Sequence, residues 1–219
     1  MNIYFLVEGK RSERKVYPKW LSYLLPEYKR VDTPEEAEHN SFYLVSGEGY
    51  PSIMHHFQNA IIDVNKVGKY DYLVVCIDVE ETSIEERKAL FYSQAHLLQD
   101  CKLKVITQNP CFESWMLGNR TIFKRNPQSA ELKRYIEHYD VSLLDPELMP
   151  SIDPERTKAQ FHASYLQNIF QERGISYTKH SPGEVAEPYY LNELEKRAID
   201  TGHIATFQDF CTFCRQIRS

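Results

Sequence analysis

Short runs of consecutive apolar residues alternate with helical patterns through the first half of the chain, and this alternation limits the fold more than any other feature. The runs at residues 3–7 (IYFLV) and 72–77 (YLVVCI) contain no polar alternation, which is typical of strands buried on both faces. Strands that alternate with helices pair in parallel. We therefore expect an α/β fold with a mainly parallel four-stranded sheet flanked by helices. The expected strands are Ile3–Val7, Phe42–Val45, Tyr72–Ile77 and Leu103–Thr107.

The segments between these strands have the apolar spacing of helices. Pro26 and Gly68 mark the ends of the first two. Ser83 and Glu86 have the spacing of a capping box at the start of the third. The expected helices are Glu13–Leu25, residues 51–67, Ser83–Gln99 and the short segment Phe112–Leu117.

The second half of the chain is predicted to be helical. Gly174 and Gly202 are positioned as C-terminal stops, whereas Asp145–Pro154 holds three prolines and little periodicity, which indicates a linker or a long loop. We expect an α/β domain at residues 1–120 and a helical extension at 121–219 packed on it. The expected helices of the extension are Leu132–Tyr139, Lys158–Glu172, Leu191–Asp200 and Phe207–Ile217.

Composition excludes some classes of protein. No apolar run reaches the length of a membrane span, and Glu8 interrupts the apolar stretch at the N-terminus, so we expect a cytoplasmic protein without a signal peptide. Five cysteines at irregular spacing argue against a disulfide framework. A net charge of −5 argues against a protein that coats nucleic acid non-specifically.

One local basic patch follows Glu8 despite the acidic composition. It is either a solvated helix face or a contact for nucleic acid, and the charges alone do not decide between the two. Its members are Lys10, Arg11, Arg14, Lys15 and Lys19.

Carboxylates follow the expected strands. Glu8 comes directly after the first, Glu48 follows the second, and Asp78 and Glu80 end the third. In an open α/β sheet, ligands bind beyond the carboxyl ends of the strands, and a cation there would relieve the repulsion between carboxylates. Oxygen ligands favour Mg²⁺ or Mn²⁺. Alternatively, each acid only caps or begins a helix, where the helix dipole favours negative charge.

Three motifs together resemble the RloB-like and OLD-like branch of the Toprim (topoisomerase–primase) families. They are EGKRSERKVY from Glu8, DVEET from Asp78 and NPCFESWML from Asn109. Glu8 is similar to the family's first glutamate, and Asp78 with Glu80 is similar to its Asp-x-Asp pair, with glutamate in place of the second aspartate. The Asn-Pro-x-Phe-Glu-x-Trp segment is the most specific of the three, and the resemblance covers about residues 1 to 120.

The resemblance implies metal-dependent cleavage of DNA or RNA, in bacterial or phage-encoded antiviral defence beside a partner ATPase. Asp78 and Glu80 would hold the metal, with Glu8 as a third ligand or as the general base. Lys179 would be a catalytic residue that offsets negative charge in the transition state. Lys10, Arg11 and Glu113 are expected near the substrate. The chain lacks a Gly-x4-Gly-Lys-Ser/Thr phosphate loop of its own.

A rival interpretation is a Toprim-shaped interaction subunit that docks on an ATPase and has no activity. The presence of Glu8, Asp78 and Glu80 together argues against it, because an inactive module does not need all three. The sequence leaves open the choice between DNA and RNA, the sequence that is cut, the activating trigger and whether the chain forms a homodimer.

Overall fold

The computed structural model describes residues 1–178 and 181–218, which form two compact units. Unit 1 contains the sheet, and unit 2 contains most of the second half of the chain. The segments Met1–Ile77, Thr82–Thr107 and the C-terminal residues from Thr212 make up unit 1, and Asp78–Glu81 with Gln108–Cys211 makes up unit 2. The predicted boundary near residue 120 divides the chain once, whereas these units interleave along it.

The sheet has five parallel strands in the order β2-β3-β1-β4-β5. The central strand β1 lies between β3 and β4, and Val7 at its end is paired with Ser46 of β3 and with Cys76 of β4. The expectation of an α/β fold with a mainly parallel sheet is confirmed, and the first and third predicted strands are neighbours. The strands are β1 (Asn2–Val7), β2 (Lys29–Val31), β3 (Ser41–Ser46), β4 (Tyr72–Asp78) and β5 (Lys102–Gln108).

The prediction of four strands missed β2. This edge strand has only three residues, and Lys29 and Arg30 are exposed, so it has no apolar pattern from which it could be found. It forms by parallel pairing with β3, in a register that places Lys29 opposite Ser41. The pairing therefore depends on a neighbour rather than on the segment's own composition.

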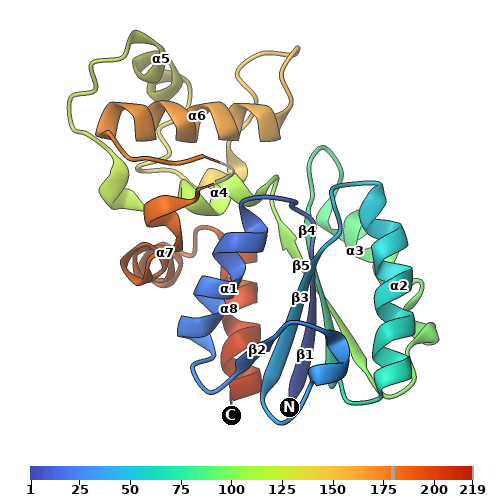
Figure 1. Ribbon diagram of the computed structural model, residues 1–219. Helices are drawn as coiled ribbons and strands as arrows, with labels where there is room; N and C mark the ends of the chain where they lie inside the picture. Colours follow the sequence, from blue (N-terminus) through green and yellow to red (C-terminus); the bar gives the residue numbers. More distant parts are fainter. Residues whose placement is uncertain (179–180, 219) are drawn as a thin grey trace. The chain divides into compact units, whose positions relative to one another are not determined.

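Helices cover both faces of the sheet, as the continuous apolar strands require (Figure 1). Along β4, Leu73, Val75 and Ile77 pack into one core with residues of α2 and α3. On the other face, Tyr72 contacts Phe213 near the C-terminus, with 5.3 Å between the ring centroids. The helical elements are α1 (Glu13–Leu24), η1 (Pro34–Glu36), α2 (Ser52–Val67), α3 (Ile84–Tyr92), η2 (Ala95–Leu97) and the last residues of α8 (Ala205–Arg218).

Helix α3 begins as predicted and ends earlier. The Ser83 hydroxyl accepts a hydrogen bond from the Glu86 N–H at 3.1 Å, and the Glu86 carboxylate accepts one from the Ser83 N–H at 3.0 Å, which confirms the capping box. The predicted end was Gln99. After Tyr92, the Ser93 hydroxyl donates to the Leu90 carbonyl at 3.0 Å, a local bond that competes with helix continuation.

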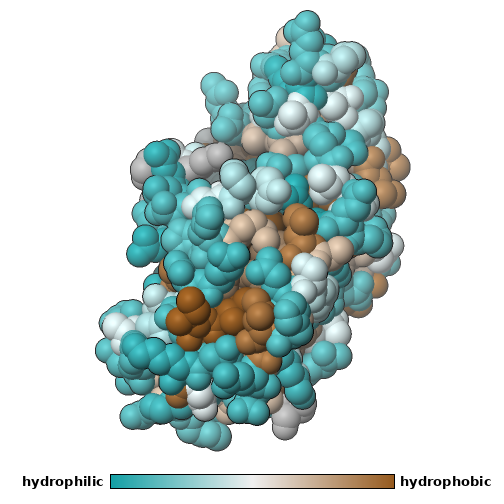
Figure 2. Space-filling model, turned by 90° about the vertical axis from the view of Figure 1, so that its right-hand side faces the viewer, coloured by the Kyte–Doolittle hydropathy of each residue, from teal (hydrophilic) through white to brown (hydrophobic). Residues whose placement is uncertain are grey.

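The face of the molecule on the α2 side carries an apolar patch among hydrophilic residues (Figure 2). The Asn65 side chain joins α2 to η2, because it donates to the Leu97 carbonyl at 2.9 Å and accepts from the Gln99 N–H at 3.1 Å. Exposed apolar side chains of α2, α3 and η2 are Ile62, Leu90, Tyr92 and Leu97. Of the helices in the described part of the chain, none is long and apolar enough to cross a membrane.

Unit 2 is helical, as predicted for the second half of the chain. Helices α6 and α7 end at Gly174 and Gly202, whose φ angles of 67° and 72° are left-handed, so both predicted stops are confirmed. The elements are α4 (Phe112–Met116), η3 (Arg120–Ile122), α5 (Ala130–His138), η4 (Pro146–Leu148), α6 (Lys158–Arg173), η5 (Gly183–Ala186), α7 (Pro188–Thr201) and the first part of α8.

The segment 145–154 is a structured loop and not a linker. It contains η4, and both Glu147 and Met149 are buried within unit 2. Asp145 caps this turn, because its carboxylate accepts from the Glu147 N–H at 3.0 Å and also from the Ile204 N–H at 3.1 Å. Of the two predicted alternatives, a linker or a long loop, the structure has the long loop, in which Pro146 begins a short helical turn.

Candidate functional site

Glu8 follows β1 directly and is held by backbone groups of unit 1. Its N–H donates to the Cys76 carbonyl of β4 at 2.9 Å, so the residue extends the pairing of the two strands. Its side chain is only 7% exposed, and Oε1 accepts a hydrogen bond from the Tyr50 N–H at 3.0 Å. A buried carboxylate that is bonded to a backbone N–H has a defined orientation at the end of the strand.

The loop after β3 lies against Glu8. The Gly49 N–H donates to the Glu8 carbonyl at 2.9 Å, and the Gly47 N–H donates to the Val7 carbonyl at 2.7 Å. Glu48 has a φ of 63°, a left-handed conformation that costs a non-glycine residue roughly 1 kcal/mol or more. This loop therefore supports Glu8 with a strained backbone, which is a frequent property of functional sites.

A second buried acid, Glu13, lies beside the turn at Gly9, and the sequence analysis did not assign it to the site. A Cβ placed on Gly9 would lie only 1.6 Å from Oε2 of Glu13, so any other residue at this position would displace the Glu13 carboxylate. Glu13 is 5% exposed, at the start of α1. The signal was present in the sequence, since Glu13 is the last residue of the Glu-Gly-x-x-Ser-Glu motif.

Lys10 and Arg11, expected near the substrate, are both exposed in unit 1. The Lys10 ammonium lies 3.2 Å from Oε1 of Glu48, and both side chains are largely solvated. An exposed pair of this kind contributes little to stability, so Lys10 can exchange Glu48 for an external anion at low cost.

In unit 2, the acidic loop Asp78–Glu81 runs beside the Asn-Pro motif. The Val79 N–H donates to the Gln108 carbonyl at 2.9 Å, and the Glu80 N–H donates to the Pro110 carbonyl at 2.8 Å. Glu80 is exposed with a φ of 56°, so it is also left-handed. Two of the three sequence motifs are thus joined by backbone hydrogen bonds.

The charges of Asp78 and Glu113 both act on the buried Cys111 thiol in unit 2. Burial raises the pKa of Cys111 well above its usual value, and the charges of Glu113 and Asp78 raise it further. Both carboxylates therefore lie within electrostatic reach of the same buried sulfur. The position of Glu113 in α4, directly after Asn109-Pro110, produces this proximity.

Glu81 anchors the acidic loop to α6. Its Oε1 accepts a hydrogen bond from the Lys158 N–H at 2.8 Å, at the first turn of the helix. A carboxylate at that place is stabilised by the helix dipole and by an N–H group without an intrahelical partner. Glu81 could not be predicted from the sequence, because its partner is 77 residues away in the chain.

A buried polar network lies behind the Asn-Pro motif in unit 2. The indole N–H of Trp115 donates to the Thr206 hydroxyl at 2.7 Å, and that hydroxyl donates to the carboxyl group of Glu147. Trp115 also contacts Phe207 and Phe210 of α8. The network serves packing, since it fixes α4 to the first part of α8 and so supports Glu113.

Glu147 makes the stability of unit 2 depend on pH. Burial raises the pKa of Glu147 from 4.5 to about 7, although the hydrogen bonds from Thr206 act in the opposite direction. The pKa of Glu147 is about 7 in the folded state and about 4.5 in the unfolded state, so protonation favours folding. This contribution to the free energy of unfolding is fully present below about pH 4.5 and is lost as the pH rises through 7. We expect unit 2 to lose roughly 2–3 kcal/mol between pH 5 and pH 8.

The measurement is chemical denaturation followed by Trp115 fluorescence in a Trp20→Phe background. The chain has two tryptophans, and Trp20 lies in unit 1. Glu147→Gln is the control, because it keeps the shape of the side chain and removes the titration. A pH dependence that persists in Glu147→Gln would contradict this assignment.

The structure places the predicted site residues in two groups. Unit 1 holds Glu8, Lys10 and Arg11, and unit 2 holds Asp78, Glu80 and Glu113. Lys179 lies outside the described residues. Within residues 1–178 and 181–218, no three His, Cys, Asp or Glu side chains are arranged so that they could hold a metal ion by themselves.

Comparison with known proteins identifies no family or function for this site. The chain has no match among protein-family models, curated proteins or solved structures.

Proposed function

We propose that this protein is a Toprim-type nuclease that hydrolyses phosphodiester bonds of DNA or RNA with Mg²⁺ or Mn²⁺. One observation carries the proposal: Glu8 follows β1 and Asp78 ends β4, and these strands are parallel neighbours in the sheet. The carboxyl edge of an open α/β sheet is where such folds bind ligands. Glu80, two residues beyond Asp78, adds a third carboxylate in a strained loop.

The donor set fits a hard divalent cation, because every candidate ligand is a carboxylate oxygen. Mg²⁺ usually takes one or two carboxylates, and waters and substrate phosphates complete its shell. Asp78 and Glu80 would hold the cation, with Glu8 as the third candidate ligand. Because waters and substrate phosphates can complete the shell, binding does not require three side chains that are already in place. When bound, the cation polarises the scissile phosphate and stabilises the leaving oxygen.

The chain's own residues would perform the remaining steps. Glu8 accepts the proton of the attacking water as the new O–P bond forms, and the departing oxygen takes a proton from solvent as the old bond breaks. Lys10 and Arg11 bind phosphate oxygens, and Lys179 is proposed to offset charge in the transition state. Glu113 is proposed to lie beside the substrate through its proximity to Asp78.

The test is incubation of the purified chain with plasmid, single-stranded DNA and tRNA, with and without Mg²⁺ or Mn²⁺. We expect cleavage of at least one substrate that EDTA abolishes. The assay is repeated with an ATPase partner, if one co-purifies with the chain. Absence of cleavage under all of these conditions would overturn the proposal in favour of an interaction subunit.

A further inference from the structure

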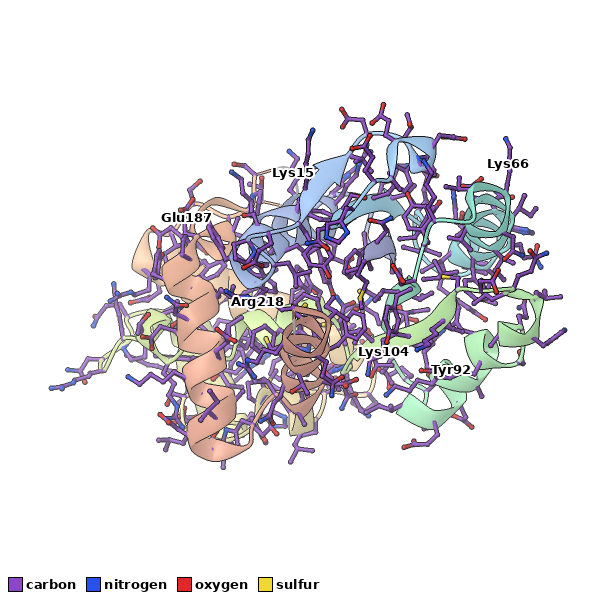
Figure 3. All side chains as sticks on the ribbon, turned by 90° about the horizontal axis from the view of Figure 1, so that it is seen from below. Lys15, Lys66, Tyr92, Lys104, Glu187 and Arg218 are labelled. Carbon is purple, nitrogen blue, oxygen red and sulfur yellow. The ribbon has the colours of Figure 1, made fainter. Side chains whose placement is uncertain are left out.

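Basic side chains gather on one side of helix α1 and in the turn before it. With about 100° per residue, Arg14, Lys15 and Lys19 fall within an arc of roughly 140° of the helix, and Lys10 and Arg11 precede it in the turn. All five are exposed, and we call them the basic face of α1. In Figure 3, Lys15 lies on the outer side of the molecule, while Lys66 projects outward from α2.

The opposite side of α1 is its packing face. Val16, Tyr17, Trp20 and Leu21 are fully buried, and Glu13 is the only acid of the helix and is buried as well. Among the large apolar side chains described for α1, Tyr23 is exposed, at 39%, and one aromatic ring does not make an apolar face beside the charges. This arrangement argues against a membrane-surface helix, which needs an exposed apolar face.

Three of these five cations are not paired with an acid among the described residues. Within the described part of the chain, Arg11, Arg14 and Lys19 form no ion pair, and Lys10 contacts only the exposed carboxylate of Glu48. Five cations thus gather on one face of a chain whose net charge is −5. A general excess of positive charge does not explain this local concentration.

We infer that the basic face of α1 binds the phosphate backbone of a nucleic acid without reading its sequence. The inference rests on the proposed function, and it extends the substrate contacts beyond Lys10 and Arg11 to Arg14, Lys15 and Lys19. From residue 14 to residue 19 the helix rises roughly 7.5 Å, and Lys10 and Arg11 continue the charges in the turn before it, so the basic face can contact more than one phosphate of one strand. Because the stripe begins just after Glu8, it leads the strand from the helix surface to the carboxyl edge of the sheet.

The test uses binding without cleavage. Fluorescence anisotropy with a labelled single-stranded DNA of mixed sequence is measured in EDTA for the wild type and for Arg14→Glu with Lys19→Glu. The matched control is Lys66→Glu with Lys69→Glu at the end of α2, which changes the net charge by the same amount. Far-UV circular dichroism and a melting curve establish that both double variants are folded.

We expect the α1 variant to bind at least about tenfold more weakly, with the slope of log K against log salt reduced by roughly 1.4 for two lost phosphate contacts. The control should bind as the wild type does. Equal weakening in both variants, no weakening in either, or a preference for anionic vesicles over DNA would overturn the inference. If the α1 variant binds more weakly but the wild type cleaves no nucleic acid, only the proposed function is refuted. If the wild type cleaves and the α1 variant cleaves equally well, only this inference is refuted.

Discussion

Asp78→Asn is expected to reduce nucleic acid cleavage by more than about a hundredfold. The amide keeps the shape of the side chain and removes the charge that a divalent cation requires. Glu8→Gln should have a similar effect, because general acid–base roles alone contribute roughly 10²–10⁴ in rate. The measurement is initial cleavage rate at saturating Mg²⁺, with the substrate that the wild type cuts fastest.

The control for this pair is Glu85→Gln, an exposed acid in the first turn of α3. It removes the same charge from a residue that is not among the proposed ligands and should leave the rate within about twofold. Asp78→Asn should not lower the melting temperature without metal, since it removes a like charge near Glu113. Cleavage that survives Asp78→Asn would place the chemistry elsewhere and end the Toprim interpretation.

Arg197→Met is expected to destabilise unit 2 by about 4 kcal/mol or more. Arg197 is 1% exposed, and its guanidinium donates to the carbonyls of Val141 at 2.8 Å, Leu144 at 2.6 Å, Leu117 at 3.3 Å and Gly118 at 3.4 Å. Each buried carbonyl left without a donor costs roughly 1–3 kcal/mol. Burial lowers the pKa of Arg197 to about 10, so the group stays charged at neutral pH and keeps all its donors.

The measurement is thermal unfolding followed by Trp115 fluorescence in the Trp20→Phe background. A loss of this size should lower the melting temperature of the 219-residue chain by roughly 8–16 °C. Arg197→Lys should recover little of it, because an ammonium group cannot reach several separated carbonyls. Lys196→Met, the exposed neighbour on the same helix, is the matched control. A shift below about 2 °C in Arg197→Met would contradict the role assigned to the guanidinium.

Much of the fold was predictable because it is encoded locally. Uninterrupted apolar runs indicated strands buried on two faces, and Gly174 and Gly202 marked helix ends that the backbone confirms. The parallel pairing of β1 with β4 followed from the helices between the strands. That pairing put Glu8 and the Asp78 motif at neighbouring strand ends, which the sequence alone could anticipate.

Only the tertiary structure decided what depends on partners distant in the chain. The strand β2 exists because β3 supplies its hydrogen bonds, and Glu81 becomes an anchor only beside Lys158. Nothing in the helical pattern around Arg197 indicates its role, which comes from four carbonyls of two other segments that its guanidinium contacts. Periodicity in a sequence shows which face of an element is buried but not against what it is buried. Polar residues whose role depends on a particular buried partner therefore emerge only when the chain is folded.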